Sequence, residues 1–268
     1  MTSETMNKAV LRSPLGILTA TAATHGTGHA DDIALPRLPG FVESAFSPLA
    51  FEVARRCLTE RAGDGSRTAV VLASLMGDTT TADLASRRVV SGRVHNPLLF
   101  MQATANSVLG HTSREFGITG QMFSLSTLDD PVTELLAMAD LLLEDPELDR
   151  VLVVGVELGG GERLAAAYRD LVADGGRPVP DLPESAALGA AVLLGRPGAE
   201  TPVTIRAEAS SLIAEARHPG SVEGLFDLVS AHRRLLDEGG EPIPVPPAFV
   251  LTTHALPERN ETEPHAHQ

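Results

Sequence analysis

The stretch QMFSLSTLDDPVTELLAMADLLLED, from Gln121 to Asp145, contains the clearest structural junction in the sequence. Its opening, QMFSLST, is a short apolar run of the kind that forms a buried strand, and the pattern ends abruptly at Asp129. Pro131 then stands at the first position of a strongly apolar helical segment, where its missing N–H costs nothing, and Asp130 stands at the capping position. The sequence therefore predicts a strand that passes directly into a helix.

Strand-like runs also occur on both sides of this junction. They are TAVVLASLMGD at 68–78, VLVVGVE at 151–157 and SAALGAAVLLG at 185–195, of which the last is either a strand or a small-residue helix that leads into one. A polar stretch to His95 is expected to be a connection, and one helix is expected to begin at Asn96-Pro97. The positions that share one face of this helix are Leu98, Met101, Ala105, Val108 and Leu109. Because strands alternate with helices, the sequence predicts a layered α/β domain.

The two ends of the chain differ from this central region. Residues 1–40 are expected to hold a first strand and a loop, although their start also loosely resembles a signal peptide, and the main domain is expected at 41–200, with folded structure beginning near Phe41. Residues 201–257 have the pattern of a strand, a helix and a last strand, which belong either to the same sheet or to a separate flap. The polar tail at 258–268 is expected to be disordered.

Composition limits the classes of function. The chain has 268 residues, of which 43% are hydrophobic, so it contains enough apolar side chains for a globular core. Its 21 basic and 35 acidic residues give a net charge of −14, which disfavours binding to nucleic acids or to anionic membrane surfaces. The single cysteine, Cys57, excludes an internal disulfide and a multi-thiolate metal site, as is typical of a cytoplasmic protein. Its position in a helical pattern predicts a buried, inert thiol. Lysine occurs once, at Lys8, which suggests a high-GC bacterial source.

Few residues could carry chemistry. Asp129 and Asp130 precede a helix N-terminus, a place where nucleophiles are activated but where carboxylates also act as simple caps. The glycines at 159–161 lack the common phosphate-binding patterns and are typical of a flexible loop. The metal-site candidates, which lack supporting ligands in the sequence, are His254, His265 and His267. The sequence therefore predicts neither a metal nor a cofactor.

A longer segment, NPLLFMQATANSVLGHTSREFGITGQMFSLST at 96–127, resembles the stretch of β-ketoacyl synthases that leads to their nucleophile elbow. VLVVGVE resembles the next strand of that family, and SAALGAAVLLG resembles the glycine- and alanine-rich segment beyond it. The three segments follow one another in the family's order. The resemblance implies the thiolase-like α/β fold, in a form truncated relative to a full ketosynthase.

Departures from the family pattern bear on activity. Where ketosynthases have a T-A-C-x-S-G elbow, this chain has TLDDPV at 127–132, so Asp129 replaces the acylated cysteine. A carboxylate cannot form the thioester that condensation requires. The family's catalytic His, Lys and His residues have no counterpart, and His254 lacks the Gly-Thr that follows the strand-end histidine. The resemblance therefore implies a chain with no condensing activity of its own.

A ketosynthase-like chain without its cysteine resembles the chain-length factors of type II polyketide synthases, and its short form resembles those of polyene and aryl polyene systems. The resemblance implies a heterodimer with an active ketosynthase, packed across a pseudo-twofold axis through the strand before the elbow. The interface residues would be Met122, Phe123, Ser124 and Leu125. It also implies that a helix lines the far end of the partner's acyl tunnel and limits product length. The tunnel-lining residues would be Phe100, Ala103, Thr104 and Ser107, for each of which ordinary packing is the alternative.

Two other functions stay open. Asp129 or Asp130 could assist decarboxylation of a malonyl group, or the chain could be a degenerate ketosynthase that acts only as a scaffold. The net charge also bears on the partner, because acyl carrier proteins are acidic and dock on basic patches. Carrier docking is therefore expected on the ketosynthase subunit, which should be the less acidic of the two.

Overall fold

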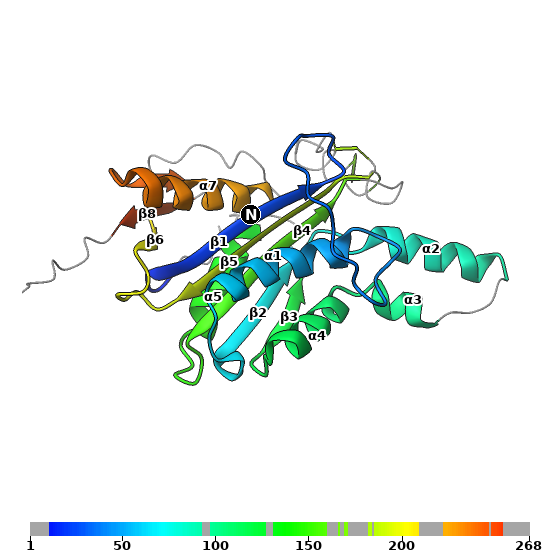
Figure 1. Ribbon diagram of the computed structural model, residues 1–268, viewed down its shortest axis with the longest axis horizontal. Helices are drawn as coiled ribbons and strands as arrows, with labels where there is room; N and C mark the ends of the chain where they lie inside the picture. The colour runs from blue at the N-terminus through cyan, green and yellow to red at the C-terminus, as the bar shows by residue number, and fades with distance from the viewer. Residues whose placement is uncertain are drawn as a thin grey trace, which may run out of the picture.

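Eight strands of the described chain form one mixed β-sheet, and helices lie on both of its faces (Figure 1). The structure is a computed structural model that describes residues 11–92, 97–126, 131–159, 182–183, 185–208, 222–246 and 248–253, together with 166 and 169–170. The strands are β1 (Leu15–His25), β2 (Thr68–Ala73), β3 (Met122–Leu125), β4 (Arg150–Leu158), β5 (Ala187–Gly195), β6 (Val203–Ala207), β7 (Ile243–Val245) and β8 (Phe249–Thr253). The helices include α1 (Phe46–Glu60), α2 (Thr79–Val90), α3 (Pro97–Gln102), α4 (Ala105–Phe116), α5 (Pro131–Leu142) and α7 (Glu223–Glu238).

The strand order is β3-β2-β4-β5-β1-β6-β8-β7. β2 runs parallel to both β3 and β4, whereas β5 runs antiparallel to β4 and to β1. The parallel strands are joined through helices, as parallel pairing requires, so their carboxyl ends meet at one edge of the sheet. The residues that directly follow β2, β3 and β4 therefore lie at that edge.

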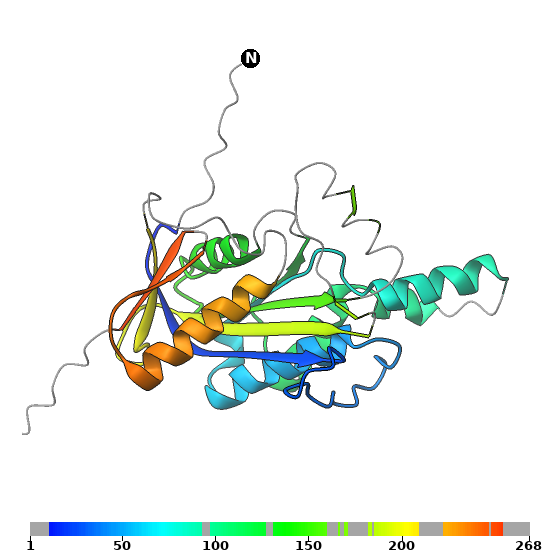
Figure 2. The same ribbon diagram turned by 90° about the horizontal axis from the view of Figure 1, so that it is seen from above.

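Both faces of the central strands are covered. Every residue of β2, β4 and β5 is buried, as their nearly continuous apolar runs predict. Helices α1 and α4 pack on one face, and α5 and α7 pack on the other, where Figure 2 shows α7 crossing the strands. Gly155 of β4 lies beneath α7, where an added Cβ would sit 2.5 Å from Leu225 Cδ1, so glycine permits this close approach. The predicted layered α/β arrangement is therefore confirmed.

The predicted limits of the folded region need correction. The first strand expected within residues 1–40 is present as β1. The expectation that folded structure begins only near Phe41 is wrong, because β1 lies inside the sheet between β5 and β6. Its sequence LGILTATAATH is rich in Thr and Ala, which weakens the apolar signal of a central strand. Residues 201–257 contain β6, α7, β7 and β8, which extend the same sheet rather than form a flap. The boundaries at 41 and 201 therefore do not separate domains, and the tail at 258–268 lies outside the described residues.

Two further expectations are wrong between β2 and β3. The polar stretch before His95 contains helix α2, whose buried residues are the small Thr79, Thr81 and Ala85 rather than large apolar side chains. The single helix expected from Asn96 is two helices, because Thr104 has an extended backbone with φ −82° and ψ 132°. Leu98 and Met101 of α3 are exposed, whereas Val108 and Leu109 of α4 are buried, so these residues do not share one face. Among the helices that the structure describes, none combines the length and the apolar character that a membrane span requires.

Candidate functional site

The carboxyl ends of β2, β3 and β4 are tied together by a buried carboxyl group. Glu157, on β4, is 3% exposed, and its Oε1 accepts a hydrogen bond from the Leu75 N–H at 2.7 Å. Ser74 Oγ lies 3.5 Å from the other carboxyl oxygen, and the Ser74 N–H donates to the Leu125 carbonyl on β3 at 3.1 Å. Ser126 Oγ donates to the Leu75 carbonyl at 2.8 Å. The loop after β2 is therefore held from both neighbouring strands.

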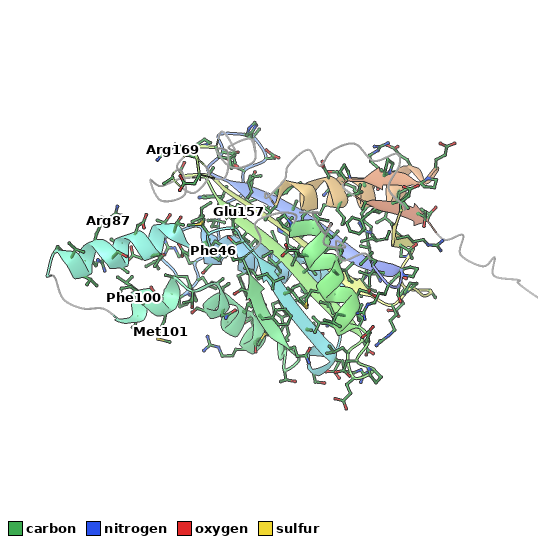
Figure 3. The ribbon with its side chains drawn as sticks, turned by 180° about the vertical axis from the view of Figure 1, so that it is seen from behind. Phe46, Arg87, Phe100, Met101, Glu157 and Arg169 are labelled. Atoms are coloured by element: carbon green, nitrogen blue, oxygen red, sulfur yellow. The ribbon has the colours of Figure 1, made fainter. Side chains whose placement is uncertain are left out.

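Glu157 has no basic partner among the described residues. Burial raises the pKa of its carboxyl group to about 8, although the hydrogen bonds from Leu75 and Ser74 act in the opposite direction. The group is therefore mainly protonated at pH 7 and does not place an unpaired charge in the interior. Figure 3 shows Glu157 inside the fold, at the strand ends.

Asp78 anchors the other end of the same loop. Its carboxylate accepts hydrogen bonds from Ser44 Oγ at 2.7 Å, from the Thr81 N–H at 3.0 Å and from Thr81 Oγ1 at 2.8 Å. It thereby caps α2 and fixes the start of this helix to the segment before α1. Burial raises the pKa of Asp78, and these hydrogen bonds offset part of that effect.

Helices α2 and α3 extend away from the sheet and form a projection, defined here as residues 79–92 and 97–102 (Figure 1). Its surface is unusually apolar, because Val90 is 89%, Met101 63% and Phe100 46% exposed. Val89 and Leu98 are exposed as well. Figure 3 shows Arg87 on α2 and both Phe100 and Met101 on α3. An exposed apolar surface of this kind is typical of an interaction site.

The predicted tunnel residues lie where α3 meets α4. Phe100 is on α3, and Ala103 is half-buried at the break between the helices. Thr104 Oγ1 donates to the Met101 carbonyl at 2.8 Å and lies 2.9 Å from Ser107 Oγ. Ser107 Oγ also donates to the Met101 carbonyl. The hydroxyl groups of Thr104 and Ser107 therefore satisfy a carbonyl at the end of α3. The role of the four residues in lining a tunnel stays a prediction.

The predicted interface strand is β3. Its residues Met122, Phe123, Ser124 and Leu125 are half-buried, and β2 is its only strand partner within the described residues. The Gln121 carbonyl accepts a hydrogen bond from Val70 of β2, and the Leu125 carbonyl accepts one from Ser74 directly after β2. The backbone groups of Met122 and Ser124 therefore face the open edge. β3 thus presents an edge that a second chain could extend.

The remaining candidates for catalysis, phosphate binding or metal binding are two aspartates, a glycine cluster, three histidines and Cys57. Asp129 and Asp130, the glycines at 160–161, and His254, His265 and His267 lie outside the described residues. Cys57 is buried as predicted, and burial raises the pKa of its thiol to about 12, which makes it a poor nucleophile. No group of three or more described His, Cys, Asp or Glu residues could hold a metal ion.

The sequence analysis did not identify the roles of Glu157, Ser74 and Asp78. The available signals were a glutamate that ends an apolar strand and an aspartate followed by threonines, which is a helix-capping pattern.

Comparison with known proteins identifies the fold. No family model matches the chain, and no curated protein sequence matches it significantly. A chain from the complex of the ketosynthase ApeO with its chain length factor ApeC, from Xenorhabdus doucetiae, has a TM-score of 0.59 at 17% identity, over 90% of this chain and 100% of that chain. The ishigamide ketosynthase/chain length factor gives a TM-score of 0.47 at 16% identity, over 85% of this chain and 74% of that chain. On the first similarity and the sheet described above, the chain has the thiolase-like α/β fold of the ketosynthases.

Proposed function

We propose that the chain is a non-catalytic chain-length factor, which forms a heterodimer with an active ketosynthase of a type II polyketide synthase and shapes its acyl tunnel. A solved structure of similar fold, with a TM-score of 0.59, contains a ketosynthase and its chain length factor. Asp129 stands where ketosynthases have their acylated cysteine, which supports a subunit without condensing activity of its own.

The observation that carries this proposal is the exposed apolar surface of the projection. Within the projection the sequence has Arg87 and Arg88 but only one acidic residue, Asp83, although the whole chain has a net charge of −14. A surface both apolar and locally basic is suited to a protein partner, since burying it removes apolar area from water.

The projection and the β3 edge belong to the same part of the molecule. Helix α4 contacts both α3 and β3, so the projection continues into the open side of the sheet. One partner could therefore extend β3 and cover α3 at once. Phe100 is the largest side chain on that surface, and in such a complex it would meet the growing acyl chain.

The proposal is tested by co-expression with the ketosynthases encoded in the same genome, followed by size-exclusion chromatography with mass determination. We expect a stable one-to-one heterodimer. Met101→Glu should weaken it because the substitution places a charge in the apolar contact. Leu141→Glu, on an exposed apolar position of α5, is the matched control and should leave the complex intact. A soluble monomer or homodimer that ignores every ketosynthase would contradict the proposal.

A further inference from the structure

A groove lies along the part of β1 that has no second strand partner. β5 pairs with β1 along nearly its whole length, but β6 pairs only with residues 15–17, and the loop at Asp32 bridges to Thr24. Between these points no described strand lies beside residues 18–23 on the side away from β5. A cavity of about 520 Å³ occupies this place, between α1 and α7. The two helices flank β1 in Figures 1 and 2.

The cavity follows the edge of the strand rather than one face of the sheet. Thr19, Ala20 and Thr21 all line it, although successive side chains of a strand point to opposite faces. These side chains are small, so another backbone can approach the strand closely. Backbone groups of alternate residues in this stretch point away from β5, because an antiparallel ladder engages only every second residue.

The walls of the groove carry an excess of positive charge. Arg55 and Arg56 line it from α1 and Arg233 lines it from α7, against one acidic lining residue, Glu60. Glu52 holds both α1 arginines at 2.9 Å and so neutralises part of their charge. Arg233 forms no salt bridge within the described part of the chain. A locally basic groove in a protein with a net charge of −14 favours an anionic ligand.

His232 adds a second observation at the same place. Its side chain lines the groove and is 5% exposed, yet its Nε2 has no hydrogen-bond partner within the described residues. Burial lowers the pKa of the ring to about 4, so the ring is neutral at pH 7. Buried polar atoms are nearly always hydrogen-bonded in native proteins. After a small rearrangement of the His232 side chain, a polar group of a ligand in the groove would supply the missing hydrogen-bond partner of Nε2.

We propose that this groove binds an extended acidic segment of a partner protein, which adds to the sheet as a strand beside residues 18–23 of β1. Main-chain hydrogen bonds would supply affinity, as in other cases of strand addition. Carboxylates on alternate sides of the segment would reach Arg55 and Arg56 on one face and Arg233 on the other. The cavity volume falls within the range of about 300–1,000 Å³ that is typical of ligand sites.

The site is distinct from the surface assigned to the ketosynthase. β2, β4 and β5 separate β1 from β3 in the sheet, so both surfaces can be occupied at once. The proposed peptide site can therefore be tested, and can fail, independently of the proposed chain-length function.

Fluorescence anisotropy of the full-length protein with three labelled peptides tests the proposal. The peptide TEETEETE carries acidic side chains in an extended backbone. TEEPEETE keeps every carboxylate but lacks a central N–H, and TKKTKKTK reverses the charge. We expect saturable binding of the first peptide and clearly weaker binding of the other two.

Two adjacent arginines provide a matched pair of variants. Arg233→Gln should weaken binding of TEETEETE by roughly two- to fivefold, the effect of one partly exposed charge pair. Arg234→Gln, on the same helix but outside the groove, should leave binding unchanged. Equal affinity for TEEPEETE would show charge attraction alone and overturn the proposal. Absence of binding, or displacement of the peptide by inorganic phosphate at matched ionic strength, would overturn it too, the latter in favour of a small-anion site.

Discussion

Glu157 accepts a hydrogen bond from the backbone N–H of Leu75 at 2.7 Å, which joins the end of β4 to the loop after β2. This loop ends at Asp78, which caps α2, so a buried carboxyl group lies at the base of the projection. The position of the proposed partner surface therefore depends on two carboxyl groups, one that is protonated at pH 7 and one that serves as a helix cap.

Stability should depend on pH through Glu157. Because its pKa is about 8 in the folded protein against 4.5 in the reference state, the folded state binds the proton more tightly between these values. Its contribution to stability is therefore complete below about pH 4.5 and declines as the pH rises to about 8, by at most about 1.4 kcal/mol per pH unit.

Glu157→Gln should reduce this slope, because the amide keeps an acceptor for the Leu75 N–H and does not ionise. Thermal unfolding of wild type and variant, measured side by side from pH 5 to pH 8.5, checks it. Parallel curves over that range would contradict the assignment.

Removing the cap of α2 should loosen the projection. Asp78→Ala should cost about 1 kcal/mol, whereas Asp78→Asn should retain most of the stability because the amide oxygen still caps the helix. The readout is the rate of trypsin cleavage after Arg87 and Arg88, which should rise only in the alanine variant. Asp64→Ala is the control, since Asp64 caps a separate short helical turn by accepting from the Ser66 N–H. Equal cleavage rates in Asp78→Ala and wild type would refute this role.

The strand framework could be predicted from sequence because β2, β4 and β5 are buried on both faces and therefore read as continuous apolar runs. The position of β1 in the sheet is harder to predict from sequence. Its Thr and Ala residues are weakly apolar, and its position in the middle of the sheet depends on pairing with β5, which lies far away in the sequence. Local patterns do not report such long-range pairing.

Helix α2 is not predicted from the sequence because its apolar signal, like that of β1, is weak. It buries small polar side chains, so the usual apolar stripe is missing, and only Asp78 marked its start. Glu157 could be read as the end of a strand, but its burial and its bond to Leu75 depend on how three strands assemble.

Side-chain volume at Phe100 should control product length if the projection reaches the partner's tunnel. Phe100→Ala should lengthen the polyketide by at least one extension, and Ala103→Phe should shorten it. Mass spectrometry of the products of the reconstituted heterodimer gives the answer, with Leu141→Ala as the control. Unchanged products in both variants, from an intact complex, would favour the scaffold alternative.

The open edge of β3 should mediate association through its backbone. Ser124→Pro removes an N–H that faces away from β2, so the ladder to β2 can persist while a partner strand loses a donor. Ser124→Ala keeps that N–H and serves as the matched control. We expect the proline variant alone to lose the ketosynthase in size-exclusion chromatography. Retention of the complex by Ser124→Pro would show that the partner does not pair with this edge.

Substitution of Asp129 distinguishes a subunit that only shapes the tunnel from one that takes part in decarboxylation. If the chain only shapes the tunnel, Asp129→Ala and Asp129→Asn should leave malonyl decarboxylation by the heterodimer unchanged, because the reacting groups belong to the ketosynthase. If the carboxylate assists decarboxylation, both variants should lose CO₂ release while the complex stays intact, since Asp129 lies outside both β3 and the projection in the sequence. Release of labelled CO₂ from malonyl carrier protein, measured with the mass of the complex, separates these outcomes from simple loss of the partner. Full activity in both variants would contradict a role of Asp129 in decarboxylation and would agree with a subunit that only shapes the tunnel.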